Sequence, residues 1–464
     1  MKPIEKILYF SKETINMIIE KINSNEIKML FRKKAEDFTR DRKLPFNVMV
    51  SLILQKWVKS LQLRLNEFSI NLSNKIETVT ASAYVQAKNK LSYELFLHLN
   101  LVVIINRYYD LKENEAGYKT WNNYRILAID GSQIRLPDEE EVKEKYWTTK
   151  IKNWKWDVWK YTHWLLSVLY DPLNKLAIDT ILERWDYSER ALAIQNIINL
   201  DKTIELIEKS LIILDRWYYS WLLASIILAY EKEFLFRLKR WAIKEADKLF
   251  EKDCKIDSKI ITLKIENKEK EYEEKYWIKL DRKIADIIKI RLIRVVLDTW
   301  EVEVLATSLL DEEKYTIDNF SELYFKRWWI ECYYNIIKNR LWLENFSWKN
   351  VESVLQDLYS TIFLSNFETI ITRANNLELE EKTKNRKLKN KQKVNKQVSF
   401  NIIKNKVIDL FLNRDKNVDE IMKEIIIILN TNTTQERKWR TSARKNTTAS
   451  KTAHFLKRKK KSCY

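Results

Sequence analysis

Glycine is nearly missing from this sequence: only Gly117 and Gly131 occur among 464 residues, whereas eighteen residues are tryptophan. A chain of ordinary composition carries roughly 7% glycine, because only a residue without a Cβ adopts positive φ at little cost. Several tryptophans stand where a turn would take glycine, such as Trp300 between two β-type apolar runs and Trp348 just past a helical stretch. Eighteen indoles cannot replace the missing glycines in turns.

A lysine- and asparagine-rich loop holds three further tryptophans: Trp154, Trp156 and Trp159. We interpret most of the tryptophans as UGA codons that the source genome reads as glycine and that are translated here as tryptophan. The alternative is a protein that uses indoles in its core or as platforms for stacked bases. The gene sequence separates the two, because UGG at most of these codons excludes recoding.

Cysteine and histidine are scarce as well. A disulfide framework and a zinc site are both unexpected, because the cysteines are odd in number and widely spaced: Cys254, Cys332 and Cys463. A reducing cytoplasm fits this usage. Structural or solvent roles are expected for the histidines, which lack the spacing of metal ligands: His98, His163 and His454.

Positive charge, in contrast, is abundant. With 84 Lys and Arg against 65 Asp and Glu, the formal charge is +19, which predicts an anionic partner. No amphipathic anchor, spanning segment or signal peptide is visible, so nucleic acid is favoured over a membrane, and a cytoplasmic location is expected. Hydrophobic residues form 45% of the chain, enough for a sizeable core in two to four structural units.

The pattern of apolar residues changes near residue 118. Before it, apolar residues recur at three and four positions, as in 46–54, which predicts helices. The segment 78–88 has the capped start of a helix with basic residues and fits either a helix-turn-helix unit or a plain bundle helix. After residue 118 come short apolar runs of the kind buried on both faces of a sheet, at 124–130, 165–171 and 211–215.

Two of these runs end in a carboxylate followed by a polar turn, at Asp130 and at Asp215. A carboxylate at the end of a buried strand is costly to desolvate, so it is normally exposed, paired or bound to a metal. Aspartate after a strand is also ordinary turn chemistry. Neither motif alone distinguishes a site from a turn.

A third acidic residue, Glu331, lies in a stretch with the apolar spacing of a helix. On a helical wheel at about 100° per residue, one narrow stripe holds Tyr324, Arg327, Glu331 and Lys338. The stripe borders a face that we expect to be buried: Leu323, Ile330, Tyr334, Ile337 and Leu341. Such a row of charges suits a metal and phosphates, and the alternative is a surface helix with an ordinary ion pair.

The spacing Tyr-x2-Arg-x3-Glu-x6-Lys of these four residues resembles the YREK signature of the DDE transposases of the insertion-sequence-four family. The surroundings of Asp130 and Asp215 resemble the first and second aspartate motifs of the family, the second of which usually reads D-R-G-Y. Trp217 replaces the glycine of that motif and Trp329 replaces another family glycine, as recoding predicts, whereas Trp328 matches a family tryptophan. The resemblance extends from about residue 40 to about residue 374.

The resemblance implies an α/β fold, with an RNase H-like catalytic core, an inserted mostly-β subdomain and a preceding all-helical N-terminal DNA-binding region. The expected domains are a helical DNA-binding region at 1–118, the first part of the core at 119–235, a β-rich insertion at 236–315, the C-terminal helices of the core at 316–375, and a basic, partly disordered tail at 376–464. The β-type runs 290–297 and 302–307 agree with an insertion, and Arg291 and Arg294 there face either DNA or solvent.

The resemblance also implies roles for single residues. The catalytic and metal-binding carboxylates are Asp130, Asp215 and Glu331, which would hold two Mg²⁺ or Mn²⁺ ions. Oxygen ligands and the shortage of Cys and His agree with these metals. Contacts to DNA phosphates are implied for Tyr324, Arg327 and Lys338.

The implied function is that of a bacterial DNA transposase that cleaves the ends of an insertion sequence and joins them to target DNA. Its partners are double-stranded DNA, namely terminal inverted repeats and target DNA, and a second copy of the chain in a homodimer. It is expected in the cytoplasm, at the nucleoid. Two alternatives stay open: a catalytically inactive DNA-binding derivative, and a structure-specific nuclease on the same core. The basic tail from Asn430 onward either binds nucleic acid without sequence information or is merely solvated.

Overall fold

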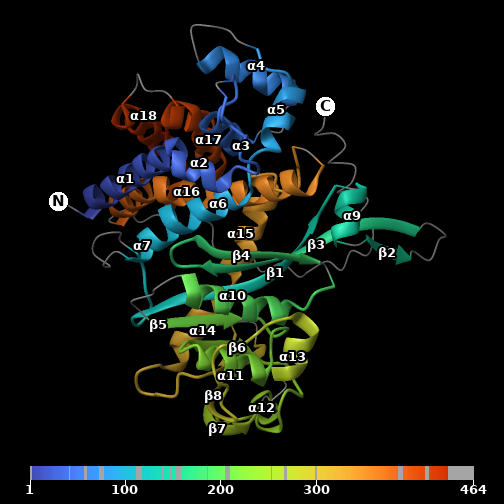
Figure 1. Cartoon of the computed structure of the whole chain (residues 1–464). Coiled ribbons are helices and arrows are strands. Elements are labelled where there is room, and N and C mark those ends of the chain that lie inside the picture. The colour runs from blue at the N-terminus through green and yellow to red at the C-terminus, as the bar shows by residue number, and fades with distance from the viewer. Residues whose placement is uncertain are drawn as a thin grey trace. The chain divides into compact units, whose positions relative to one another are not determined.

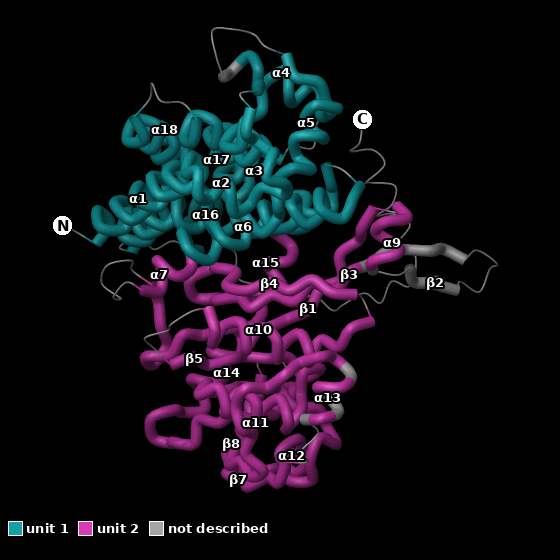
Figure 2. Tube along the Cα trace, viewed as in Figure 1, with its two compact units in different colours: residues 1–104, 337–464 teal, residues 105–336 magenta. Residues whose placement is uncertain are grey.

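The computed structural model describes residues 3–40, 42–56, 60–72, 78–110, 118–137, 139–146, 148–152, 158–184, 186–203, 209–251, 253–265, 269–297, 300–347, 349–384, 390–412 and 417–436. The chain divides into two compact units: unit 1 consists of residues 1–104 and 337–464, and unit 2 of residues 105–336 (Figure 2). Each unit is described by itself. Six residues singled out above lie outside the described residues: Gly117, Trp154, Trp156, Trp348, His454 and Cys463.

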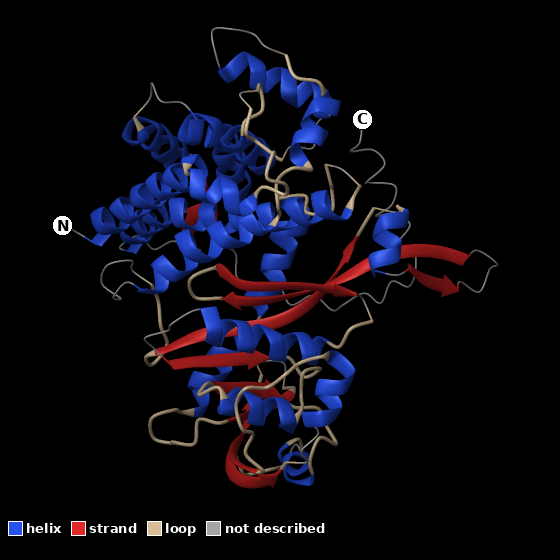
Figure 3. Ribbon diagram, viewed as in Figure 1, coloured by secondary structure: helices blue, strands red, loops and turns tan. Residues whose placement is uncertain are grey.

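Unit 1 is almost entirely helical, as Figure 3 shows. Its longest helix, α16 (Val351–Lys384), contacts α1, α3, α6, α17 and α18, and it is buried on all sides over most of its length. The helical elements are α1 (Pro3–Asn23), α2 (Asn25–Phe31), α3 (Phe46–Gln55), α4 (Leu61–Leu72), α5 (Ala81–Lys88), α6 (Glu94–His98), α16, α17 (Lys396–Leu412) and α18 (Val418–Thr431). A short pair of strands, β10 (Gln392–Val394) and β11 (Thr433–Gln435), joins them, and the π-helices η1 (Leu99–Asn106) and η2 (Ile336–Arg340) cross the unit boundaries.

Unit 2 is built on one mixed sheet with the strand order β2-β3-β1-β5-β6-β9-β8-β7, in which β4 also pairs with β3 (Figures 1 and 3). The pairs β1–β5 and β5–β6 are parallel, and the other pairs are antiparallel. The strands are β1 (Tyr124–Arg135), β2 (Thr148–Lys152), β3 (Val158–Asp171), β4 (Leu176–Arg184), β5 (Lys209–Leu214), β6 (Glu233–Arg237), β7 (Ser258–Lys264), β8 (Ile287–Val296) and β9 (Val302–Thr307). The helices are α7 (Arg107–Asp110), α9 (Glu140–Tyr146), α10 (Glu189–Thr203), α11 (Trp221–Ala229), α12 (Lys244–Leu249), α13 (Glu269–Tyr276), α14 (Ile317–Phe325) and α15 (Trp328–Asn335).

The central strands β1 and β5 are buried on both faces. In β1 the neighbours Ile126 and Leu127 are both fully buried, so successive residues on opposite faces both enter a core. One face packs on α14 through Phe320 and Leu323. This two-sided burial explains why both strands read as continuous apolar runs and not as alternating ones.

The predicted mixed α/β class and the helical N-terminal region are confirmed. The order β4-β3-β1-β5-β6, with an antiparallel β1–β3–β4 meander followed by parallel β5 and β6, agrees with the RNase H-like core that the resemblance implies. The strands β7, β8 and β9 fall within the predicted range 236–315 and continue this sheet through the pairing of β6 with β9. An inserted subdomain separate from the sheet stays a prediction, as do the predicted domain boundaries.

The prediction that the first strand ends at Asp130 is wrong. Strand β1 continues to Arg135, because Gly131 and Ser132 still pair with Ser167 and Leu166 of β3. Only the pairing with β5 stops early, at Ala128. The polar residues Gly131 and Ser132 therefore belong to a strand that has lost one of its two neighbours, and not to a turn.

The prediction of one regular helix from Tyr324 to Lys338 is also wrong. Helix α14 ends at Phe325, and the amides of Lys326 and Arg327 bond to carbonyls three residues earlier before α15 begins at Trp328. Beyond Asn335 the segment continues as the π-helix η2. A single helical wheel therefore does not describe the segment, although the predicted apolar face is confirmed, with every member at most 7% exposed: Leu323, Ile330, Tyr334, Ile337 and Leu341.

Helix α5 has the predicted cap but not the exposed basic face of a recognition helix. The side chain of Thr80 accepts a hydrogen bond from the amide of Ala83, as the sequence suggests. Lys88, however, is fully buried and forms an ion pair with Asp357 at 2.7 Å. Lys88 therefore holds α5 to α16 and is not available to DNA in this structure.

Neither Arg291 nor Arg294 faces DNA or open solvent. Arg291 is 2% exposed and donates hydrogen bonds to the carbonyl of Tyr315 and the hydroxyl of Ser258. Arg294 donates to the carbonyl of Leu249. The apolar neighbours on β8 bring the strand into the core, so both guanidinium groups find their hydrogen-bond acceptors within unit 2.

Part of the predicted basic tail is folded. Helices α17 and α18 fall between residues 396 and 431 and bury apolar side chains such as Phe400, Ile403 and Leu429. Both helices belong to unit 1 and contact α16. Residues after Glu436, with the run of lysines at 457–461, lie outside the described part of the chain.

Candidate active site

Asp130 and Asp215 lie side by side just past the point where the parallel pairing of β1 with β5 ends. In the register of β1 and β5, Ala128 faces Ile213, so the two aspartates follow this last pair at equal distance along each strand. Both side chains are half-buried. The carboxyl edge of parallel strands brings their following residues together, which is how two aspartates 85 positions apart reach one place.

Each aspartate accepts a hydrogen bond from the chain that follows it. The amide of Gly131 donates to Oδ1 of Asp130 at 3.0 Å, and the amide of Trp217 donates to Oδ1 of Asp215 at 2.7 Å. These bonds fix the carboxylates relative to their own strands. The second oxygen of each carboxylate remains for another partner.

Glu331 stands in the first turn of α15, and its carboxylate binds the guanidinium of Arg327, with Oε1 3.0 Å from Nη2. Arg327 is 6% exposed and occupies the turn between α14 and α15. Burial alone would lower the pKa of Arg327, but interactions with Tyr324, Glu331, Asp215 and Asp130 together raise it. The guanidinium is therefore the positive centre around which the three predicted catalytic carboxylates gather.

Asp130 has the most perturbed carboxyl group of the site. Burial raises its pKa from 3.8 to about 7, and the carboxylates of Glu331 and Glu189 raise it as well, while Arg327 and the Gly131 amide lower it. A carboxylate surrounded by like charges in a poorly solvated place lacks positive charge. The single guanidinium of Arg327 does not supply enough positive charge to bring the pKa of Asp130 back to its ordinary value.

Tyrosines support this edge of the sheet. The hydroxyl of Tyr334 lies 2.7 Å from the carbonyl oxygen of Asp130 and 3.0 Å from that of Leu166, so it can donate to either. Tyr324 is also buried, and burial raises the pKa of its hydroxyl. Tyr218 is 1% exposed, and its hydroxyl has no hydrogen-bond partner among the described residues.

The donor set fits a hard divalent cation. All candidate ligands are carboxylate oxygens, which Mg²⁺ and Mn²⁺ prefer, and the raised pKa of Asp130 shows that the site can accept more positive charge. Among the described residues, no three Asp, Glu, His or Cys side chains already converge as a closed set of ligands. Arg327 holds Glu331 instead.

Five of the six predicted site residues meet in unit 2: Asp130, Asp215, Tyr324, Arg327 and Glu331. Lys338 does not join them there, because it lies in η2 on the side of the boundary that belongs to unit 1. Its role stays a prediction.

The sequence interpretation missed Glu189. This residue begins α10, and its carboxylate covers Gly131 so closely that a Cβ at Gly131 would lie 3.1 Å from Oε1. Burial and the charge of Asp215 both raise its pKa. The only signal in the sequence was an acidic residue at the start of a helix. Acidic residues are favoured at the N-terminus of any helix, so this signal does not distinguish a site residue.

The sequence pattern of the transposase DDE domain family matches residues 121–367, which include every residue of this site. The match covers more than half of the chain. The protein therefore belongs to the transposase DDE domain family.

Comparison with solved structures finds a likeness to the piggyBac transposase, in a cryo-EM structure of its synaptic complex with hairpin DNA. The two share 11% sequence identity, with a TM-score of 0.42, over 98% of this chain and 86% of that one. No curated protein matches the sequence. Within the described residues, no helix is both long and apolar enough to cross a membrane.

Proposed function

We propose that this protein is a DNA transposase of the cut-and-paste type, which cleaves the ends of its insertion sequence and joins them to target DNA. The observation that carries the proposal is the gathering of Asp130, Asp215 and Glu331 around the buried guanidinium of Arg327, within the matched family region. Two carboxylates at one edge of a sheet and a third on α15 beside them have no evident structural use, because each must be desolvated beside the others.

The three carboxylates would hold two Mg²⁺ or Mn²⁺ ions. Bound there, the metal ions would activate an oxygen nucleophile and neutralise charge on the phosphate and on the leaving oxygen. Asp130 and Asp215 each accept a hydrogen bond from a main-chain amide that follows them, so they present their second oxygens from a fixed position at the strand edge. Oε1 of Glu331 would become available to a metal ion once Arg327 released it.

Arg327 therefore has two partners at different stages. Without DNA its guanidinium neutralises Glu331. With DNA bound, it would turn to a phosphate, since guanidinium groups bind carboxylate and phosphate with the same geometry. Tyr324, beside it, would donate to a phosphate oxygen, and Lys338 would supply a further positive charge.

The proposed partners are double-stranded DNA, as terminal inverted repeats and as target, and a second copy of the chain. Paired cleavage at two ends needs two active sites, which a symmetric homodimer supplies. A bacterial protein of this kind would work in the cytoplasm, at the nucleoid. The net charge of +19 supports a polyanionic partner.

The test is cleavage of a labelled duplex that contains the element's own end, with Mn²⁺ or Mg²⁺ added. We expect Glu331→Gln to reduce cleavage more than roughly 100-fold, because losing a metal ligand should cost more than losing a residue that only supports a ligand, which costs up to about 100-fold. End binding should stay nearly intact. Glu322→Gln is the matched control, because Glu322 is an exposed glutamate on α14. Equal loss of binding and cleavage in Glu331→Gln would contradict a catalytic role.

The alternatives predict other products. A structure-specific nuclease would cut the duplex without joining its 3′ ends to target DNA. An inactive derivative would bind the end and never cut it. Joined products with target duplications of one fixed length identify the transposase.

We also infer that many of the tryptophans are glycines in the organism that makes this protein. Four described tryptophans have φ in the left-handed region, namely Trp241 at 69°, Trp277 at 56°, Trp300 at 63° and Trp342 at 55°. Their side chains are 42% to 89% exposed, so packing does not explain indoles there. Trp277 directly follows the end of α13, the position where helices most often take glycine.

The codons test the recoding directly. UGA at these four positions is expected, and mass spectrometry of the protein from its native source should find glycine. UGG codons at most of them would reject recoding. Trp217 and Trp329 do not have positive φ, so their assignment as glycine depends on the family motif alone.

A further inference from the structure

Three basic side chains from separate elements surround Asp215. Arg190 is the second residue of α10, Arg216 directly follows Asp215 after β5, and Lys239 comes two residues after β6. We call these three residues the basic rim. All lie in unit 2, on the carboxyl ends of β5 and β6 or at the start of the helix beside them.

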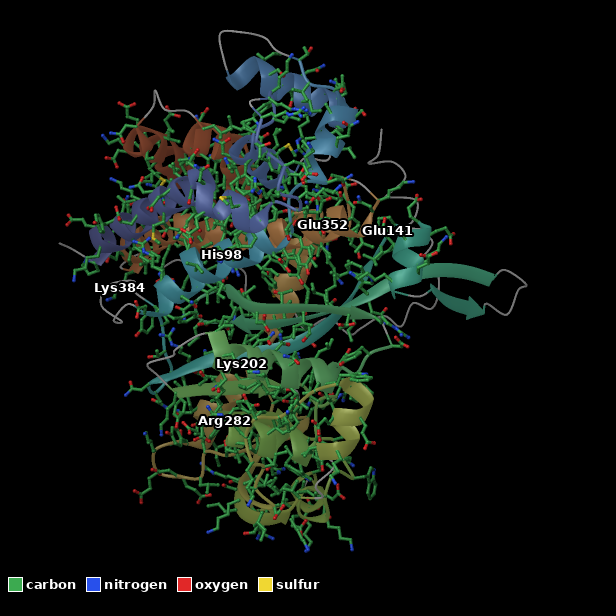
Figure 4. All side chains as sticks on the ribbon, viewed as in Figure 1. His98, Glu141, Lys202, Arg282, Glu352 and Lys384 are labelled. Carbon is green, nitrogen blue, oxygen red and sulfur yellow. The ribbon has the colours of Figure 1, made fainter. Side chains whose placement is uncertain are left out.

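The basic rim is not neutralised within the described part of the chain. None of its members forms an ion pair there, and Arg190 donates only to the main-chain carbonyl of Trp217, at 3.2 Å from both Nε and Nη2. Six other arginines of unit 2 differ from the rim, because each pairs with a carboxylate: Arg184, Arg237, Arg282, Arg291, Arg294 and Arg327. One of these, Arg282, is labelled in Figure 4 and pairs with Asp201 at 2.7 Å.

The members of the basic rim are close enough to repel one another. Desolvation lowers the pKa of Lys239, and the charges of Arg216 and then Arg190 lower it further, with only Asp215 opposing them. Like charges held together by a folded scaffold cost free energy until an anion arrives. Arg216 is well exposed, so the rim is open to a large ligand.

The scaffold holds the rim through main-chain atoms. The carbonyl of Trp217 fixes Arg190, and the amide of Trp217 fixes Asp215, so one peptide segment positions both. The ammonium of Lys239 lies 3.4 Å from the centre of the Trp217 ring. If residue 217 is glycine in the native protein, Arg190 and Asp215 keep their bonds and Lys239 becomes free.

We propose that the basic rim is a phosphate-binding site for the DNA backbone, which takes phosphates beside the one that is cut. The rim adjoins Asp215 at the carboxyl ends of β5 and β6, whereas Tyr324 at the end of α14 and Arg327 in the turn after α14 approach the same carboxylates. The DNA strand would thus be held on both sides of the catalytic carboxylates. The inference rests on the proposed function and adds to it residues outside the Tyr-Arg-Glu-Lys signature.

The first experiment measures how duplex binding depends on salt, with Ca²⁺ replacing Mg²⁺ so that binding is not obscured by cleavage. Removing one cation that binds a phosphate should reduce the slope of log K against log salt by about 0.9. Arg190→Gln and Lys239→Gln should each reduce the slope by this amount. The triple variant, which also carries Arg216→Gln, should reduce it by roughly 2.7. Lys259→Gln is the control, because Lys259 is exposed on the edge strand β7. It should keep the slope of the parent protein.

The second experiment locates the bound phosphate on the DNA and excludes free phosphate as the ligand. The parent protein should bind a duplex with one neutral methylphosphonate beside the cleavage site more weakly than the unmodified duplex. The triple variant should bind both duplexes equally. Inorganic phosphate at millimolar concentration should compete equally with binding by both proteins if the rim takes only backbone phosphate. Competition that is strong in the parent and absent in the triple variant would mean a free phosphate site.

The two proposals fail differently. If the parent protein neither binds nor cleaves the element end, the proposed function fails. If it binds and cleaves while the rim variants keep its salt slope and its response to methylphosphonate, only the basic rim is refuted. Thermal unfolding of each variant shows whether a reduced slope reflects a loss of folding.

Discussion

The residue that balances the charge of this site is Arg327. Its guanidinium is buried among carboxylates and bonds Glu331, so a cation already sits where catalysis needs cations. Removing it would leave Asp130, Asp215 and Glu331 without a positive neighbour of comparable burial. Without metal, the charge balance of the folded site therefore depends on Arg327, whose guanidinium would have to leave Glu331 for a DNA phosphate before the reaction.

Asp130 gives the site a pH dependence with a defined sign. Its pKa is about 7 in the folded protein and near 3.8 when exposed, so between these values the folded state keeps a proton that the unfolded state has released. The free energy of unfolding should therefore fall as pH rises from 4 to 7 and level off above 7. Urea unfolding of Asp130→Asn at the same pH values should lack this decline.

Metal binding should show the opposite trend. A divalent ion needs the ionised carboxylate, so its binding releases the proton of Asp130 below pH 7. We expect Mn²⁺ affinity to rise up to tenfold per pH unit below 7 and to change little above it. Calorimetric titration in buffers of different ionisation heat measures both affinity and proton release, and an affinity independent of pH between 6 and 8 would contradict this role of Asp130.

The left-handed tryptophans make a separate prediction about stability. A residue with a Cβ pays roughly 1–2 kcal/mol in that conformation, whereas glycine pays little. Trp300→Gly and Trp277→Gly should therefore raise the free energy of unfolding by about 1 kcal/mol each. Trp164→Gly is the contrasting control, because Trp164 is 1% exposed in β3, and its loss should destabilise the protein by several times that amount.

Among single residues, the sequence motifs singled out three carboxylates and one arginine of the site, but no member of the site outside the motifs. Asp130, Asp215 and Glu331 fall in motifs with fixed neighbours, and the structure brings them to one guanidinium. Arg190 and Lys239 have no such motif. They reach Asp215 only through the parallel order of β5 and β6, which is long-range information.

At the scale of elements, the runs of apolar residues predicted five strands of unit 2, but not all of their ends. Strand β9 has the predicted bounds, whereas β1 continues five residues past Asp130 because β3 still pairs with polar Gly131 and Ser132. A backbone hydrogen bond does not require an apolar side chain. Strand ends therefore depend on the neighbour, which the sequence does not reveal locally.

The break between α14 and α15 had a similar cause. The apolar face runs through the break without interruption, since Leu323 and Ile330 are both fully buried. Its period is compatible with one helix, and only the amide bonds of Lys326 and Arg327 show the tighter turn. The tighter turn places Arg327 where a regular helix would not.

Helices α5 and α16 offer a test of a buried ion pair. The side chains of Lys88 and Asp357 are 0% and 2% exposed, so removing one partner leaves an uncompensated charge. We expect Lys88→Met to lower the free energy of unfolding by about 3–5 kcal/mol. The double variant with Asp357→Asn should recover much of this loss, and urea unfolding of the four proteins in the cycle measures the coupling. Losses of the two single variants that simply add up in the double variant would show that the pair itself contributes nothing.

At the scale of the whole molecule, the sequence predicted a helical beginning and a mixed α/β middle but not the fold of the segment after residue 375. Its many lysines and asparagines led us to expect a tail, although Phe400, Ile403 and Val407 are buried in α17. Unit 1 combines these late helices with the first hundred residues. Packing decides which distant helices share a core. The sequence of a single helix does not contain this information.

The discontinuity of unit 1 has a consequence for synthesis. Helix α1 packs on α16, which leaves the ribosome about 330 residues later. At roughly 5–20 residues per second, α1 waits roughly 20–70 s for this partner, while the continuous unit 2 is completed in between. The nascent chain must therefore carry the face of α1 that packs on α16 without this partner through most of translation, with the early helices α2 and α3 against α1.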